Sequence, residues 1–195
     1  MGSSEKKWAI VAASIASAAI IATIVFTLRK RKSGGVKNGN KSILLLGGLD
    51  NRAGDKSISE QVAMMRKEVG GDFNIDGFRY FDKEGVLAAL KENPNQYVVL
   101  FSAGCRYALD VAKKINELGG DLKKMFILEP YAASESTAES VRAAVRIGVP
   151  PRNVFVGAYK AAGQGVVADA TPTPNCSPSH WCSLSEVSKK IAAKA

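Results

Sequence analysis

The feature that most constrains the fold is a regular alternation of apolar runs and helical patterns after residue 42. Five short runs are almost continuously apolar, and each precedes a segment whose apolar residues recur at three- and four-residue spacing. The runs are Ile43–Leu49, Gly77–Phe81, Tyr97–Ser102, Lys124–Pro130 and Asn153–Ala158. Strands of this kind separated by helices are typical of a parallel sheet covered on both faces. The sequence therefore predicts a three-layer α/β/α domain with a mainly parallel five-stranded sheet.

The helical segments have recognisable ends. Ser57 is suited to be an N-cap, and Glu60 completes a capping box. Asn93-Pro94 and Gly119-Gly120 are expected to end two of the helices. A stretch rich in Gly, Ala, Thr and Pro, residues 161–179, leads to the last one. Helices are expected over residues 57–69, 83–93, 105–118, 136–148 and 183–195.

An apolar segment precedes this domain. Residues 8–28 carry no charged side chain, and a helix of about 20 apolar residues crosses a bilayer. Trp8 is placed as an interfacial anchor. The basic block 29–32 follows directly and outweighs Lys6-Lys7, which predicts that the C-terminal domain is cytoplasmic. A cleaved signal peptide is the alternative, but it would have a shorter apolar region and no such block. We therefore expect a single-pass membrane protein with a retained signal-anchor.

The charge distribution excludes one class of partner. The formal net charge is +9, but residues 1–41 hold eight basic residues against one acid, and the rest holds 19 against 17. The folded part is thus nearly neutral, and no nucleic-acid binding is predicted for it. The expected organisation is an N-terminal tail (1–7), a transmembrane helix (8–28), a basic and flexible linker (29–42) and the folded α/β domain (43–195). Small residues spaced by four within residues 12–17 would permit a homo-oligomer or larger assembly.

Cysteine and histidine are too few for a metal centre. The chain has Cys105, Cys176, Cys182 and the single His180, without metal-type spacing. No metal and no cofactor is predicted. Cys176 and Cys182 could form a disulfide in an oxidising compartment. Because the domain is predicted to be cytoplasmic, two free thiols are expected instead.

Three loops carry the polar residues expected at the carboxyl ends of the strands, where open α/β sheets bind their ligands. They are Gly47–Asp50 after the first run, Ser102–Gly104 after the third and Ser179–Trp181 before the last helix. The charges of Asp50, Arg52 and Asp55 are expected to be solvated.

The order and placement of these loops resemble the α/β-hydrolase superfamily, in a minimal form of about cutinase size. In that family the nucleophile sits in G-x-S-x-G on a sharp strand-to-helix turn. The resemblance covers the chain from Ser42 onward and implies that Ser102 is the nucleophile and His180 the general base. It implies Asp169 as the acid, with Glu129 as the alternative. The amides of Ala103 and Leu49 would form the oxyanion hole.

The chain also departs from the family pattern. Leu100 stands where the motif has its first glycine, so the turn matches only on its Gly104 side. No carboxylate follows the fifth run directly, where the family expects its acid. A Ser-x-Gly turn is also common after parallel strands for steric reasons alone.

Three functions are consistent with these observations. The first is a membrane-anchored serine hydrolase that acts on an acyl ester or lipid substrate through a Ser-His-acid triad. The second is a non-catalytic, hydrolase-like structural or binding protein displayed on the bilayer. The third is a flavodoxin-like module that binds a phosphorylated ligand at the Ala103-Gly104 helix start, although the chain has no Walker lysine and no G-x-G-x-x-G.

Overall fold

A parallel sheet forms the centre of the domain. The computed structural model describes residues 41–50, 56–130, 135–156, 166–172 and 181–194. Within them six strands lie in the order β2-β1-β3-β4-β5-β6, and every neighbouring pair is parallel. The strands are β1 (Lys41–Leu46), β2 (Phe73–Phe78), β3 (Tyr97–Phe101), β4 (Met125–Leu128), β5 (Val154–Val156) and β6 (Thr171–Pro172). The α/β class and the parallel sheet are confirmed.

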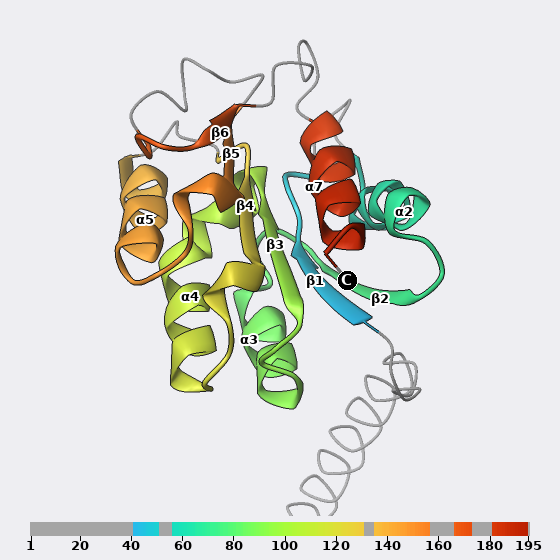
Figure 1. The fold of residues 1–195 in the computed structure, drawn as a ribbon, viewed down its shortest axis with the longest axis horizontal. Coiled ribbons are helices and arrows are strands. Elements are labelled where there is room, and N and C mark those ends of the chain that lie inside the picture. Colours follow the sequence, from blue (N-terminus) through green and yellow to red (C-terminus); the bar gives the residue numbers. More distant parts are fainter. Residues whose placement is uncertain (1–40, 51–55, 131–134, 157–165, 173–180, 195) are drawn as a thin grey trace, which may run out of the picture. The chain divides into compact units, whose positions relative to one another are not determined.

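Helices cover both faces of the sheet. Helices α2 and α7 lie on one face, and α3, α4 and α5 lie on the other (Figure 1). The helices are α2 (Ile58–Val69), α3 (Lys83–Glu92), α4 (Ala108–Glu117), α5 (Glu135–Arg146) and α7 (Cys182–Ala192), with 3-10 turns η1 (Ser102–Tyr107), η2 (Leu122–Lys124) and η3 (Pro151–Asn153). The capping box of Ser57 and Glu60 is present at the start of α2. Asn93 caps the end of α3, as its sequence predicts.

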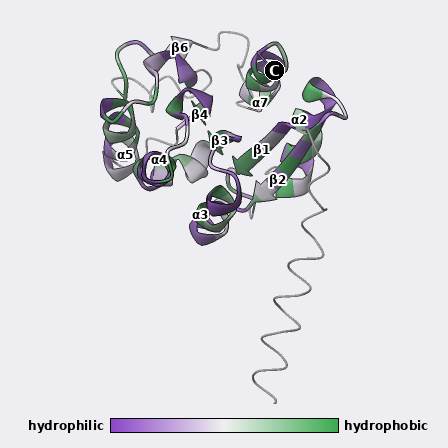
Figure 2. Ribbon diagram, turned by 60° about the horizontal axis from the view of Figure 1, so that its bottom comes forward, coloured by the Kyte–Doolittle hydropathy of each residue, from purple (hydrophilic) through white to green (hydrophobic). Residues whose placement is uncertain are grey.

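The alternation of side chains along the strands divides the core in two. In β1, Leu44 and Leu46 belong to the cluster under α3, α4 and α5, whereas Ile43 and Leu45 belong to the cluster under α2 and α7. All four side chains are fully buried. Figure 2 shows β1 as largely hydrophobic and the helices as partly hydrophobic and partly hydrophilic. Both clusters are formed by the single compact unit Asn40–Ala195.

Two strands differ from expectation. The second strand was expected at residues 77–81, but β2 ends at Phe78, and Asp82 donates its amide to the carbonyl of Arg79 in a turn. The strand lies earlier because Phe73 and Ile75 are buried at alternate positions of an edge strand, while their neighbours Asn74 and Asp76 are polar. A sixth strand, β6, pairs with β5 by only two residues and was too short to be detected from periodicity.

The chain changes direction across the sheet between β1 and β3. After β1 it passes to α2 on one face, and after β3 it passes through η1 to α4 on the other. Since β1 and β3 are hydrogen-bonded neighbours, their carboxyl ends border a topological switch point. The loop Gly47–Asp50 and the turn that begins at Ser102 therefore start side by side.

The predicted membrane helix is outside this description. In the ranges that the structure covers, no helix is both long enough and apolar enough to cross a bilayer. Residues 8–28 are not among them, so the anchor remains a prediction.

Candidate functional site

Ser102 occupies a strained turn at the carboxyl end of β3. It follows the last strand residue, Phe101, and is the first residue of η1. Its φ is 51°, a left-handed conformation that L-residues other than Gly, Asn and Asp rarely adopt. Such strain persists only where the surrounding structure enforces it, and it is concentrated at functional sites. A sharp, strained strand-to-helix turn is also what exposes the nucleophile in the G-x-S-x-G motif. Here the serine keeps 7% of its surface exposed.

Gly104 lets the turn approach the end of β1. A Cβ atom at this position would lie 2.6 Å from the carbonyl oxygen of Leu46 and 2.8 Å from that of Gly47. Both contacts are with backbone atoms, which a side-chain rotation cannot relieve. The glycine of the Ser-x-Gly sequence is therefore required by the packing of one loop on the other, whatever the role of the serine.

Gly48 brings the loop after β1 against Ser102. A Cβ atom added to Gly48 would be 3.1 Å from Cβ of Ser102 and 3.0 Å from the ring of Phe101. The loop is held by Gln61, a fully buried residue of α2 that accepts the Gly48 amide at 3.0 Å and donates to the Lys56 carbonyl at 2.8 Å. Gln61 was not predicted to support this loop, because its only signal in the sequence is an amide within an apolar helical pattern.

The two amides predicted as oxyanion donors are those of Leu49, in the loop after β1, and Ala103, directly after Ser102. The amides of Gly47 and Gly48 are used by the fold, since they donate to the Phe78 carbonyl and to Gln61. Within the described residues no hydrogen bond is made by the amide of Leu49. Ala103 is the second residue of η1, where amides have no partner inside the helix.

Glu129 lies one strand away from Ser102. Phe101, the last residue of β3, pairs with Leu128, the last residue of β4. Ser102 directly follows Phe101, and Glu129 directly follows Leu128. Glu129 also has a left-handed backbone, with φ 47°, and is 2% exposed. Its amide donates to the Phe155 carbonyl at 2.8 Å. The left-handed backbone of Glu129 costs stability, so the surrounding fold has to enforce it.

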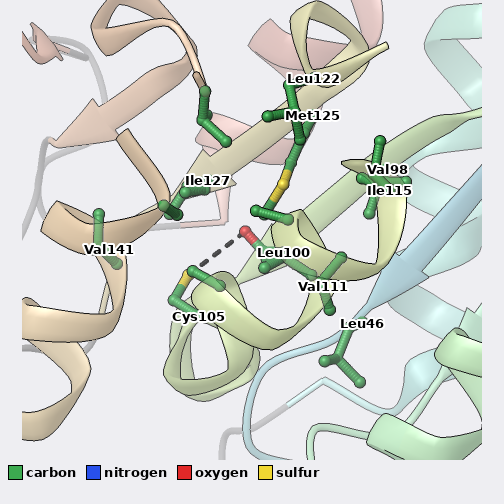
Figure 3. Close-up of a cluster of buried hydrophobic side chains, with 14 of the residues drawn as sticks. Leu46, Val98, Leu100, Cys105, Val111, Ile115, Leu122, Met125, Ile127 and Val141 are labelled. Atoms are coloured by element: carbon green, nitrogen blue, oxygen red, sulfur yellow. Dashed lines mark hydrogen bonds between the residues drawn. The ribbon is translucent and has the colours of Figure 1, made fainter. Parts of the chain in front are cut away.

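Cys105 packs below this pair, as the small core residue that the sequence predicts. Its thiol lies 3.4 Å from the carbonyl oxygens of Leu100 and Leu128. Burial raises the pKa of the Cys105 thiol, and the charge of Glu129 adds to the increase. The thiol is thus a neutral donor and not a nucleophile. Figure 3 shows Leu100 beside Cys105 and Val111, where it is completely buried. Cys105 and Ala108, both small, belong to the same buried cluster as Leu100.

Asp169 is not brought near Ser102. It is exposed and precedes β6, whose Thr171 pairs with Phe155 of β5. Because β6 is parallel to the other strands, Asp169 lies toward its amino end. Three strand spacings separate β6 from β3, about 14 Å at 4.8 Å each. Of the two candidate acids, Glu129 is the one beside the serine.

His180 falls outside the described residues, but the next residue is placed. The ring of Trp181 packs on the ring of Phe101 with centroids 5.0 Å apart. Phe101 is the residue directly before Ser102. The start of α7 therefore lies at the same end of the sheet as the strained turn.

Asp50 was expected to be a solvated loop charge, and this prediction is wrong. Its side chain is 7% exposed and accepts two hydrogen bonds from Arg79, at 2.7 Å from Nε and 3.0 Å from Nη2. Arg79 also lies over the ring of Phe81, 4.8 Å from its centroid. The bidentate pair joins the loop after β1 to the residue that follows β2. Arg52 and Asp55 lie outside the described residues.

The expectation of free thiols near His180 is wrong for Cys182, which is disulfide-bonded. Cys105 is free, and Cys176, the remaining cysteine of the sequence, lies outside the described residues. The prediction failed because it followed from the expected compartment and not from the residues themselves. Disulfides are typical of oxidising compartments.

Neither metal chemistry nor a known relative adds to this site. Within the described ranges, no group of three or more His, Cys, Asp or Glu residues could hold a metal ion. No family model, no curated protein and no solved structure matches the chain. The strand order is also compatible with flavodoxin-like sheets, which use the same switch point. Function must therefore be argued from the residues at that point.

Proposed function

We propose that the protein is a membrane-anchored serine hydrolase with Ser102 as its nucleophile, His180 as general base and Glu129 as the acid. The observation that carries the proposal is the strained, left-handed backbone of Ser102 at the switch point between β1 and β3. A purely structural Ser-x-Gly turn has no need of this conformation at a serine, because glycine adopts it at far lower cost.

The proposed reaction is acyl transfer to Ser102. Its Oγ attacks the carbonyl carbon of an ester while His180 takes the hydroxyl proton. The amides of Ala103 and Leu49 stabilise the negative charge on the carbonyl oxygen. When the intermediate collapses, His180 returns the proton to the departing alcohol. Water then attacks the acyl-enzyme while His180 takes its proton, and His180 returns that proton to Ser102 Oγ as the carboxylic acid product leaves.

Glu129 is preferred to Asp169 on geometric grounds. The two residues Ser102 and Glu129 end neighbouring strands at the same level, and strands are about 4.8 Å apart. A triad acid has to reach the far nitrogen of an imidazole that itself contacts the serine. Asp169, three strands away and exposed, is not suited to that task.

A second candidate is a non-catalytic, hydrolase-like protein on the membrane. The low exposure of Ser102 favours it, because a nucleophile has to meet its substrate. In this case the turn would contribute only shape, and any partner would recognise the surface around it.

Fluorophosphonate labelling of the full chain separates the two candidates. Wild type is expected to be labelled, and Ser102→Ala to be unlabelled while remaining folded. Ser59→Ala, at an exposed serine in the first turn of α2, is the matched control and retains labelling. Folded wild type that does not react, or a Ser102→Ala variant that labels equally, contradicts the hydrolase.

The identity of the acid needs its own pair of variants. Glu129→Gln keeps the shape but removes the charge, and the labelling rate is expected to fall about 100-fold or more. Asp169→Asn is expected to leave the rate unchanged. The opposite pattern would return the role to Asp169.

A further inference from the structure

The face of the sheet under α2 and α7 carries a row of four aromatic rings, each with one lysine beside it. The rings of Phe73, Tyr97, Phe126 and Phe155 follow one another with centroid distances of 6.4, 6.5 and 6.4 Å. Three of them, those of Phe73, Phe126 and Phe155, belong to buried residues at 7%, 0% and 4% exposure. The row lies toward the amino ends of the strands.

The lysines come from three separate parts of the chain. The ammonium of Lys41 is 5.7 Å from the Phe73 ring centroid, and that of Lys124 is 5.5 Å from Tyr97. From the end of α7, Lys194 is 5.7 Å from Phe126 and Lys190 is 4.9 Å from Phe155. A cation over a ring keeps its charge, because the ring offers only its quadrupole. We name Lys41, Lys124, Arg152, Lys190 and Lys194 the basic edge.

The charge of the basic edge is not neutralised within the described residues. None of its five cations forms an ion pair there, although Lys189 on the same helix pairs with Glu186. Burial lowers the pKa of Lys190, and the charges of Lys194 and Arg152 add to this effect. Lys190 therefore lies close enough to Lys194 and Arg152 to be repelled by both. Such a cluster is costly unless an anionic partner neutralises it.

Acidic residues do occur along the same end of the sheet. Asp72 precedes β2, Asp121 precedes η2 and Asp169 precedes β6, and all three are exposed. None of them comes within ion-pair distance of the basic edge, and Asp121 instead caps η2 by accepting the Lys123 amide at 2.9 Å. The sequence could not reveal this local excess of positive charge, because acidic residues elsewhere make the folded part nearly neutral.

We infer that the basic edge binds the anionic headgroups of a lipid bilayer. The chain enters the domain at Lys41, a member of this edge, after the basic block 29–32 and the apolar segment 8–28. Basic clusters beside a membrane segment bind anionic lipid by charge attraction. Single-stranded nucleic acid is a poorer fit because the aromatic rings lie under lysines within the core, so their faces are not free to stack on bases.

This orientation has a consequence for the substrate, which rests on the proposed hydrolase. Ser102 is at the carboxyl ends of the strands, opposite to the basic edge. With the basic edge on the bilayer, the strained turn faces the aqueous phase. The acyl substrate would then be a water-soluble ester and not a membrane lipid.

Headgroup quenching in nanodiscs tests the orientation with the full chain. Fluorophores are attached at Ala193→Cys, next to the basic edge, and at Ser59→Cys, in the first turn of α2 at the opposite end. In discs of phosphatidylcholine and phosphatidylglycerol with quencher on the headgroup, quenching is expected to be several-fold stronger at position 193. The difference should disappear in pure phosphatidylcholine. Equal quenching at both positions, or no dependence on lipid charge, would overturn the inference.

Charge-reversal variants identify the residues responsible. Each lysine near an anionic surface contributes about fivefold to binding, so Lys190→Glu with Lys194→Glu is expected to lower cosedimentation with phosphatidylglycerol vesicles more than tenfold. Lys56→Glu with Arg106→Glu, near the starts of α2 and α4, is the charge-matched control. Equal effects of both pairs, or tighter binding of an RNA oligonucleotide than of the vesicles, would contradict a lipid-binding edge. Vesicle binding needs no inserted anchor, so this result also holds if residues 8–28 do not span a membrane.

Discussion

Ser102 and Glu129 are the first residues beyond two adjacent strands, and both have a positive φ, 51° and 47°. No other residue except glycine has a positive φ in the described part of the chain. Ser102 and Glu129 therefore lie next to each other at the carboxyl ends of β3 and β4, beside the switch point. Left-handed backbone at a non-glycine residue costs about 1–2 kcal/mol. Concentrated there, the cost is characteristic of a functional site and not of imperfect packing.

This strain predicts a separation of stability from activity at position 102. Ser102→Gly is expected to raise the free energy of unfolding by about 1 kcal/mol, because glycine tolerates the conformation that serine does not. The same change removes the hydroxyl and should abolish labelling by a fluorophosphonate. Denaturant unfolding measures the first effect.

Ser102→Ala is the control for that measurement, since alanine loses the hydroxyl but keeps the strain. Its stability is expected to stay close to that of wild type. If Ser102→Gly is no more stable than Ser102→Ala, the backbone at this position is not strained in solution.

A glycine pair tests the contact between the two loops. Gly104→Ala places a methyl group 2.6 Å from the Leu46 carbonyl oxygen, so the turn has to move away from β1. We expect a loss of about 3 kcal/mol or more in unfolding free energy, in the range of overpacked core sites. Gly71→Ala is the matched control, because nothing lies within 4 Å of its added Cβ. Equal melting temperatures for the two variants would show that the loops are not in contact.

Most of the fold followed from local pattern. The strands β1, β3, β4 and β5 and the five helices of the described residues were expected close to their observed positions, because each has a clear period and a recognisable end. The exceptions are the edge strands. β2 alternates polar and apolar residues, and β6 is two residues long, so neither has the apolar run typical of a central strand.

The site was less accessible to sequence reasoning for a physical reason. Ser102 and Gly104 were identified because a small turn after a strand is a local feature. Gln61, Arg79 and the row of lysines were missed because their roles depend on partners distant in the chain, such as Gly48 and Asp50. Glu129 ranked second to Asp169 since only the strand order reveals that it adjoins Ser102.

The buried thiol of Cys105 predicts a loss of stability at alkaline pH. Its pKa is raised from 9.0, chiefly by burial, so the native thiol stays protonated where the unfolded thiol ionises. Above pH 9 the unfolded state therefore binds fewer protons, and stability falls by up to about 1.4 kcal/mol per pH unit from this group. Below pH 9 the thiol is protonated in both states and has no such effect.

Cys105→Ala removes this contribution. The variant is expected to be less stable at pH 7 through lost packing, but its stability should decline less steeply between pH 9 and 10.5. Parallel curves for the two proteins would mean that the thiol ionises in the native state. Urea unfolding at each pH gives both curves.

The disulfide at Cys182 predicts where the domain is found. Cysteine pairs persist in oxidising compartments, whereas the basic block 29–32 favours a cytoplasmic domain, so the two features conflict. We expect the disulfide to form: a peptide joining Cys176 to Cys182 should be found by mass spectrometry of protein alkylated during cell lysis.

Closing so short a loop stabilises a fold by about 2 kcal/mol, so reductant or Cys182→Ser should lower the melting temperature. Reductant should have no effect on Cys182→Ser itself, which separates loss of this bond from other effects of reduction. If both thiols are instead alkylated at lysis, the result supports the orientation predicted from the basic block 29–32, with the domain on the cytoplasmic side of its membrane.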